Sequence, residues 1–270
     1  MNNSSRKLQV TGLAIYPVKS LTGIALTGME LGPLGPCGDR RYILVDEHNR
    51  YVTQRQYPRL CLLSAIPQGG RLLLQGPGLA DLMLDPEAID PRRTLVSIWG
   101  DDVAACDMGA AAAAWFSDFL QRPARLYFMP DDTQRQVDLR YARPGDRVGF
   151  ADGFPILLTT QSSLEAINSE LPQPIGMERF RPNIVVGGCA AFAEDSWRRI
   201  RIGAIEFDIV KPCSRCVIPS IDPRTAQMQK IVTQTLFRLR RRDGGIYFGQ
   251  NLIHRAHGTI AVGDSVSVIE

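Results

Sequence analysis

Long apolar runs are missing from this 270-residue sequence. No segment approaches the roughly 18 consecutive apolar residues that a membrane-spanning helix requires. Met1 to Val10 contain neither the apolar core nor the small-residue cleavage site of a secretory signal. We therefore expect a globular protein without a targeting signal and without a membrane partner.

Clustered charge of one sign is also scarce. The 31 Lys and Arg residues face 28 Asp and Glu residues, which leaves a net charge of only +3. No stretch interleaves clustered basic and aromatic residues as nucleic-acid-binding segments do, so we expect no nucleic-acid partner. The six cysteines are too dispersed for a disulfide scaffold, and this pattern predicts a reducing, cytoplasmic location.

Short strand patterns dominate what is present. Apolar and polar residues alternate from Leu8 to Ile15, and Tyr42 to Val45 is followed by a turn and a second apolar run, which predicts a hairpin. Paired glycines and prolines separate further short strands as far as Leu84. These patterns predict an α+β fold that is mostly β.

Helical patterns are few. An alanine-rich segment predicts a helix from Gly109 to Leu120, and a capping box at Ser162 to Glu165 predicts the start of a second helix. We place a domain boundary after the first helix, which divides the chain into residues 1–125 and 126–270. The polar stretch from Asp131 to Arg147 is predicted to be a surface loop that could cover a site.

Two segments carry reactive or charged groups on predicted loops. Lys19 and Ser20 follow the first strand, and an ammonium, a hydroxyl and free backbone N–H groups in one loop suit a phosphate, although a solvated turn would look the same. Cys213 and Cys216 stand three positions apart between two prolines, after a predicted hairpin. Thiolates bind soft metals and act as nucleophiles, so this pair requires a chemical explanation.

The residues alone leave three interpretations of the cysteines open. A structural zinc site would add His254 and His257, although the intervening gap exceeds the usual finger spacing. A redox pair of the thioredoxin type would sit at the start of a helix in a βαβ unit, whereas prolines and strands surround Cys213 and Cys216. Two partly buried structural thiols would need no ligand, but would leave the surrounding basic residues unexplained.

Several motifs around the cysteines together resemble those of the MOSC domain. They are Phe180-Arg181-Pro182-Asn183-Ile184-Val185-Val186, Ala193-Glu194-Asp195-Ser196-Trp197, Ile202-Gly203, Cys213-Ser214-Arg215-Cys216 and Ile221-Asp222-Pro223. The amino-terminal half is similar to the β-rich domain that precedes MOSC in the amidoxime-reducing molybdenum enzymes and their bacterial relatives, through Ile15 to Ser20, Asp39-Arg40 and Val52 to Leu60. The resemblance covers nearly the whole chain and implies a MOSC β-barrel packed against an amino-terminal β-rich (MOSC-N) domain, with a cofactor between them.

The resemblance also implies a molybdenum cofactor, in which a molybdopterin carries the metal. Cys216 corresponds to the thiolate that ligates molybdenum, so it is the expected metal ligand and catalytic residue. The positions where the family holds the pterin and its phosphate are Lys19, Ser20, Arg40, Arg181, Asn183, Ser214 and Arg215. Such donors suit an anionic phosphate, because an Arg side chain offers a planar fork of charge-assisted hydrogen bonds.

The function implied by the resemblance is reduction of N–O bonds. We expect a molybdenum-dependent oxidoreductase that acts on N-hydroxylated compounds such as hydroxylamines, amidoximes and N-hydroxylated bases, as in detoxification. The alternative is a carrier of molybdenum cofactor or of a persulfide on Cys216, because MOSC domains also occur in cofactor sulfurases. A sulfurase would need an additional pyridoxal-phosphate domain, so the amino-terminal half favours the reductase.

Two departures from the family concern electrons and substrates. Some bacterial relatives have an iron–sulfur domain after MOSC, and this chain reaches Glu270 without the cysteines of such a domain, so we expect a separate electron-donor protein of the ferredoxin, flavodoxin or reductase type. The arginine-rich end of a predicted helix, Arg238 to Arg242, is either a solvated helix end or a docking face for an acidic donor, and we predict that it receives the donor. Asn251 stands where the animal enzymes have an aromatic residue, and Cys189 and Cys213 match family cysteines other than the metal ligand.

Overall fold

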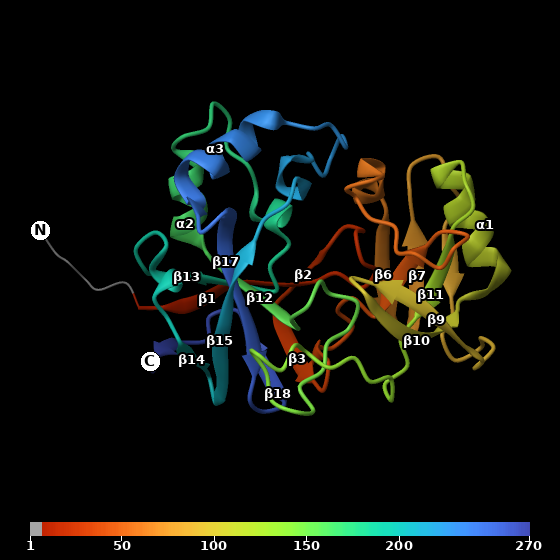
Figure 1. Ribbon diagram of the computed structural model, residues 1–270, viewed down its shortest axis with the longest axis horizontal. Coiled ribbons are helices and arrows are strands. Elements are labelled where there is room, and N and C mark those ends of the chain that lie inside the picture. The colour runs from red at the N-terminus through yellow and green to blue at the C-terminus, as the bar shows by residue number, and fades with distance from the viewer. Residues whose placement is uncertain (1–6) are drawn as a thin grey trace, which may run out of the picture.

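The computed structural model describes residues 7–270, so most of the segment in which no targeting signal was expected lies outside the described residues. Two β-rich parts lie side by side (Figure 1). The first and the last strands of the chain belong to the same part, and the strands from β5 to β11 form the other. None of the described helices is both long and apolar enough to cross a membrane.

The larger part is built on a nine-stranded sheet. Its strands in spatial order are β19 (Val266–Val268), β14 (Arg199–Ile202), β15 (Ile205–Ser214), β17 (Gly245–His254), β12 (Ile156–Thr160), β13 (Ile184–Gly187), β1 (Gln9–Ile15) and β2 (Ile24–Leu26), with β16 (Arg241–Arg242) paired to β17. The β12–β13 pair is parallel and the other pairs are antiparallel. A bridge between Gln9 and Ser265 joins β1 to the chain next to β19, so the sheet curls back on itself.

Period-two patterning places the core of this sheet. In β15 the side chains of Ile205, Phe207 and Ile209 are buried and alternate with less buried neighbours. They pack with apolar residues of β1, β12, β13 and β17 in one cluster. A small sheet of β18 (Gly258–Ala261), β3 (Gly28–Gly32) and β4 (Gly35–Pro36) contributes to the same core.

The smaller part contains two further sheets. One has the order β5 (Tyr42–Val45), β11 (Arg125–Phe128), β10 (Asp101–Asp107) and β9 (Arg93–Ile98), and the other consists of β6 (Ser64–Gln68), β7 (Arg71–Gln75) and β8 (Leu82–Leu84). Every residue of β5 is buried, because its side chains enter one apolar cluster through Tyr42 and Leu44 and a second through Ile43 and Val45. Helix α1 (Gly109–Leu120) has the predicted bounds and packs into the first of these clusters.

Two local predictions were wrong: the start of the second helix and the position of Cys213 on a loop. Helix α2 (Gln161–Asn168) begins two residues earlier than the capping box indicated, because the N-cap is Thr160 and not Ser162, and the Thr160 side chain accepts from the Ser163 N–H. Helix α3 covers Lys230–Arg240. Short 3₁₀ turns are η1 (Pro58–Leu62), η2 (Met177–Phe180), η3 (Ala193–Asp195) and η4 (Ile218–Ser220). Cys213 lies at the end of β15, so only Cys216 is on the predicted cysteine loop.

The mostly β fold class is confirmed by these elements. Strand pairing crosses the division that we predicted at residue 125, because β1 pairs with β13 of the carboxy-terminal half and β11 pairs with β5 of the amino-terminal half. Each half of the sequence therefore contributes a strand to a sheet of the other half.

Candidate functional site

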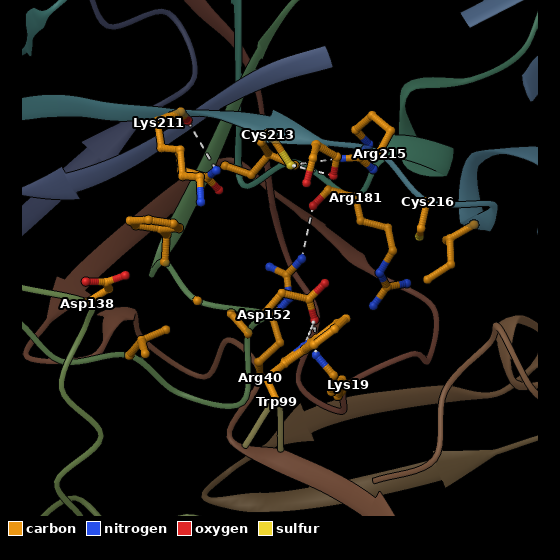
Figure 2. A pocket seen from close by; sticks show the side chains of 18 of the residues that line it. Lys19, Arg40, Trp99, Asp138, Asp152, Arg181, Lys211, Cys213, Arg215 and Cys216 are labelled. Atoms are coloured by element: carbon orange, nitrogen blue, oxygen red, sulfur yellow. Dashed lines mark hydrogen bonds and ion pairs between the residues drawn. The ribbon is translucent and has the colours of Figure 1, made fainter. Parts of the chain in front are cut away.

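One large cavity, of about 970 Å³, lies between the two parts (Figure 2). All eight predicted site residues line it: Lys19, Ser20, Arg40, Arg181, Asn183, Ser214, Arg215 and Cys216. They come from the loop after β1, the turn before β5, the approach to β13 and the end of β15. Segments almost 200 residues apart therefore meet at one place, and the role of each residue there stays a prediction.

The cavity is strongly cationic. Eight cationic side chains against three acidic ones line it within residues 7–270, a local excess of five positive charges, whereas the whole chain carries only +3. The cations are Lys19, Arg40, Arg55, Arg135, Arg140, Arg181, Lys211 and Arg215, and the acids are Asp101, Asp138 and Asp152. Such a concentration of one charge in a cleft favours an anionic ligand.

Lys19 links the loop after β1 to the segment around Phe150 and Asp152 in the cavity wall. Its buried ammonium donates to the backbone oxygen of Phe150 at 3.0 Å and forms an ion pair with Asp152. Asp152 also accepts from Arg55 at 3.2 Å and from the indole N–H of Trp99 at 3.1 Å. Burial alone would raise the pKa of Asp152, but the charges of Lys19 and Arg55 hold it well below its usual range. Asp152 is therefore an anion that ties three donors from different elements.

Tyr16 separates two of the predicted arginines. The guanidinium carbons of Arg40 and Arg181 lie 4.3 and 4.2 Å from the centre of its ring. Arg40 also binds the buried carboxylate of Asp39 at 2.7 Å and the Asn183 side-chain oxygen at 3.2 Å. Burial raises the pKa of Tyr16 to about 12, so its hydroxyl stays protonated and donates to a backbone oxygen.

Two buried donors in the cavity have no hydrogen-bond partner among residues 7–270. They are Nη2 of Arg181 and Nε of Arg215. Burial and the neighbouring charge of Arg40 lower the pKa of Arg181 to about 10, which shows how poorly its charge is compensated. A buried donor without an acceptor costs free energy, and an anion supplied by a ligand would satisfy both donors.

The backbone is strained at several positions in the cavity wall. Ser20, Arg40, Trp99 and Arg181 all have positive φ, at 73°, 44°, 54° and 57°. Non-glycine residues adopt this left-handed conformation only where the surroundings impose it, and such residues concentrate at functional sites. Three of these residues, Ser20, Arg40 and Arg181, are predicted cofactor-binding residues that line the same cavity.

Cys216 presents an exposed thiol at the cavity wall, opposite the side where Lys211 lies (Figure 2). Cys213, by contrast, is partly buried, and its sulfur accepts from Nη1 of Arg215 at 3.1 Å. Arg55 belongs to the other part of the molecule and also lines the cavity. Burial lowers the pKa of Arg55, but the neighbouring Cys216 sulfur and the Asp152 carboxylate raise it above the ordinary value.

Sequence reasoning missed Arg55, Trp99, Asp152 and Tyr16 as site residues. Only the tertiary fold brings them together, since Arg55 and Asp152 are 97 positions apart. Tyr16 and Arg55 lie within motifs that carried the family resemblance, and this was the signal available for them. The polar stretch predicted to cover a site does contribute to the wall, through Gln136, Asp138, Arg140 and Tyr141.

The zinc interpretation of the cysteines is wrong. Within residues 7–270 no group of three or more His, Cys, Asp or Glu side chains is placed to hold a metal ion. His254 instead contacts the backbone oxygen of Gly32 at 2.9 Å. The thioredoxin interpretation fails as well, because Cys213 lies in strand β15 and, within residues 7–270, the next α-helix begins only at Lys230.

The residues present suit the molybdenum cofactor that the family implies. A pterin phosphate would supply acceptors for the unpartnered donors of Arg181 and Arg215, and it would offset the positive charge of the cavity. Cys216 offers a single soft sulfur ligand at the same cavity. The fold and this cavity define a two-part β protein with a cationic cleft beside one exposed thiol.

Comparisons with known proteins identify the family. The model of the MOSC N-terminal beta barrel domain matches residues 7–123, and that of the MOSC domain matches residues 145–267. Mitochondrial amidoxime-reducing component 1 of Xenopus laevis is 34% identical over 95% of this chain and 81% of that protein. The human component 1 is 35% identical over 96% and 82%, and human component 2 is 33% identical over 97% and 84%. The chain belongs to the MOSC family that includes these amidoxime-reducing components, as its motifs predicted.

Proposed function

We propose that this protein is a molybdenum-cofactor-dependent reductase of N-hydroxylated compounds, such as hydroxylamines, amidoximes and N-hydroxylated bases. The observation that carries the proposal is the meeting of an exposed thiol, Cys216, with the unpartnered buried donors of Arg181 and Arg215 in one cationic cavity. Relatives named as amidoxime-reducing components support the reaction class. The cytoplasmic location stays part of this proposal.

The chain's own residues would have distinct tasks. The cofactor supplies, when bound, the oxygen-accepting metal and the electrons for cleaving the N–O bond. Cys216 would hold the metal, and Arg181 and Arg215 would bind the anionic group of the pterin. Lys19 and Arg40 are already paired with Asp152 and Asp39, so they would contribute mainly by holding the cavity in shape. Arg55 would keep the Cys216 sulfur oriented toward the cavity.

Electrons would come from a separate protein. The arginine-rich segment predicted to dock that donor is close to the cysteine loop, since the Arg215 N–H donates to the backbone oxygen of Ile246 at 2.7 Å and Ile246 pairs with Arg241. Part of its charge is compensated within the chain, because Arg240 and Arg242 both bind Asp195. The exposed Arg238 pairs with Glu170 at 2.7 Å, whereas the exposed Arg241 has no ion-pair partner among residues 7–270, so Arg241 carries most of the charge that a donor would meet.

The first test is the metal and pterin content of wild type and Cys216→Ser, both purified from a host that makes molybdenum cofactor. Wild type should contain nearly stoichiometric molybdenum and pterin and should reduce benzamidoxime with a reduced viologen dye as donor. Cys216→Ser should lose most of its molybdenum, by about tenfold or more. Cys37→Ser, which removes another exposed thiol, should behave as wild type.

The outcome also separates the alternative functions. Wild type that contains molybdenum but reduces no N-hydroxylated compound, and passes its cofactor to another apoenzyme, would indicate a carrier. A persulfide on Cys216 in the intact mass would indicate sulfur transfer. Protein without molybdenum or pterin from a competent host would contradict the proposed reductase.

A further inference from the structure

One end of the cavity has no task in the proposed cofactor site. Lys211 and Asp138 lie on one side, and Cys216 lies on the opposite side (Figure 2). Lys211 belongs to β15, whereas Asp138, Arg140 and Tyr141 belong to the polar stretch that contributes to the cavity wall. Two elements far apart in the sequence therefore build this end.

An aromatic ring with two cations forms the wall at this end. The Lys211 ammonium lies 4.9 Å from the centre of the Tyr141 ring, and the Arg140 guanidinium carbon lies 5.7 Å from it. The Tyr141 ring in turn packs edge-on against Phe154, with ring centres 5.7 Å apart. The arrangement is an aromatic ring that holds positive charge over its face.

The positive charge of Lys211 is not neutralised within the chain. Asp138 accepts from Arg140 at 2.5 and 2.9 Å, so this carboxylate is engaged by the arginine. Hydrogen bonds from Arg140, with a smaller contribution from the charge of Lys211, lower the pKa of Asp138 to about 2. Among residues 7–270 the half-buried Lys211 ammonium has neither an ion-pair partner nor a hydrogen-bond acceptor. Three N–H donors therefore face the cavity without an acceptor.

The distance along the chain suits a small substrate. Lys211 precedes Cys216 by five residues, and an extended chain of that length spans at most about 18 Å. An aromatic amidoxime with an acidic group on the far side of its ring is shorter than this upper limit.

We propose that Lys211, Arg140 and Tyr141 form a subsite for the anionic group of the substrate, so that the protein prefers N-hydroxylated aromatic compounds that carry a carboxylate or a phosphate. Tyr141 would hold the Lys211 ammonium in place over its ring, and that ammonium would bind the anion. This inference rests on the proposed function, because it concerns the substrate of the same cavity.

The test compares two substrates that differ by one carboxylate group. Turnover of benzamidoxime and of 4-carboxybenzamidoxime is measured on the cofactor-loaded protein with a reduced viologen donor. We expect wild type to have a higher kcat/KM for the acid by about threefold, mainly through KM, as a partly exposed ion pair allows. Lys211→Met should bring the ratio of the two kcat/KM values close to one, and Lys211→Glu should invert it.

A matched control and a binding measurement complete the design. Arg71→Met removes an exposed cation on β7, outside the cavity, and should leave the substrate ratio as in wild type. Calorimetric titration with 4-carboxybenzamidine and benzamidine tests the subsite without turnover, and the acid should lose its advantage in Lys211→Glu. Melting temperatures of the variants establish that they are folded.

The possible outcomes distinguish a substrate subsite from a part of the cofactor site and from failure of the proposed reductase. A substrate ratio that is the same in wild type, Lys211→Met and Lys211→Glu would overturn the subsite. Loss of molybdenum and pterin from the Lys211 variants, with equal loss of both activities, would also overturn it, since this end would then hold the phosphate of the cofactor. If loaded wild type reduces neither compound, the proposed reductase fails, while a charge preference in the titrations that depends on Lys211 would still support the subsite.

Discussion

Asp152 shows at the level of single residues how the cavity is held in shape. Its carboxylate is the common partner of Lys19, Arg55 and Trp99, and no other carboxylate of the described chain binds any of these three side chains. Without it, two cations would face each other in a cavity that already has an excess of positive charge. The sequence could not have revealed this role, because Asp152 stands among ordinary loop residues and gains its partners only through the fold.

Replacing Asp152 tests this account. We expect Asp152→Asn to lower the free energy of unfolding at pH 7 by about 1–3 kcal/mol, a value reduced for the partial exposure of the carboxylate. The pKa of Asp152 is depressed in the folded state, so its contribution is present above the unfolded pKa of about 3.9 and is lost as the pH falls through the lower folded pKa. Urea unfolding of both proteins at pH 7, 5 and 3 should show the difference shrinking only at the lowest pH.

Asp102→Asn provides the control for this comparison. Asp102 is exposed on β10 and does not line the cavity, so its replacement should change stability little at any pH. A difference between wild type and Asp152→Asn that stays constant down to pH 3 would mean that the carboxylate acts through its shape and not through its charge.

At the level of elements, the sequence predicted helix bounds that depend on local composition and missed element ends that depend on contacts between distant segments. The alanine-rich composition of α1 predicted Gly109 to Leu120, and these are the observed bounds. The start of α2 was misplaced because Thr160, Ser163 and Glu194 share buried hydrogen bonds, so the cap belongs to a network that spans three elements. The strand position of Cys213 was missed because β17 extends β15 by pairing with it as far as Ser214.

Close packing of two segments behind the cavity gives a prediction for Gly149. A Cβ atom there would lie 2.9 Å from the backbone oxygen of Arg40 and 3.3 Å from that of Asp39. Phe150, the next residue, donates to the same Arg40 oxygen at 2.7 Å, so the Arg40 backbone cannot retreat without losing this bond. Gly149→Ala should therefore lower the free energy of unfolding by about 1–3 kcal/mol.

The same substitution should weaken cofactor retention, because it displaces Arg40 from its position against Tyr16. Urea unfolding and the molybdenum content of the purified protein measure the two effects. Gly28→Ala is the control, since its Cβ would meet only the Ile260 oxygen at 3.8 Å, and Gly28 is exposed on β3. Equal losses in both variants would mean that the Arg40 contact is not the cause.

At the level of the whole molecule, charge is distributed very unevenly. The cavity lining holds an excess of five positive charges, so the remainder of the chain is slightly acidic. Composition could not predict this, because a net charge of +3 in 270 residues is compatible with an even surface. The family motifs did place eight residues that the fold brings to one cavity, but the acids and aromatic residues that organise them came only with the structure.

The same reasoning gives a prediction for the docking of the electron donor. Arg238 and Arg241 lie on the exposed side of the segment that adjoins the cysteine loop, and neither contributes to the cavity. Redox donors such as flavodoxins are acidic, and opposite potentials raise the rate of encounter. Arg238→Glu with Arg241→Glu should slow turnover driven by reduced flavodoxin by about tenfold at low ionic strength.

Turnover with an artificial donor distinguishes a defect in donor docking from a defect in the fold. Turnover driven by a reduced viologen dye should be as in wild type, because a small donor needs no docking face, and the defect with flavodoxin should shrink as salt screens the charges. Arg71→Glu with Arg92→Glu makes the same change of charge on exposed residues of the other part of the molecule and should slow neither reaction. Equal slowing with both donors would instead show that Arg238 and Arg241 support the fold around the cysteine loop, through the Glu170 ion pair and the pairing of Arg241 with Ile246.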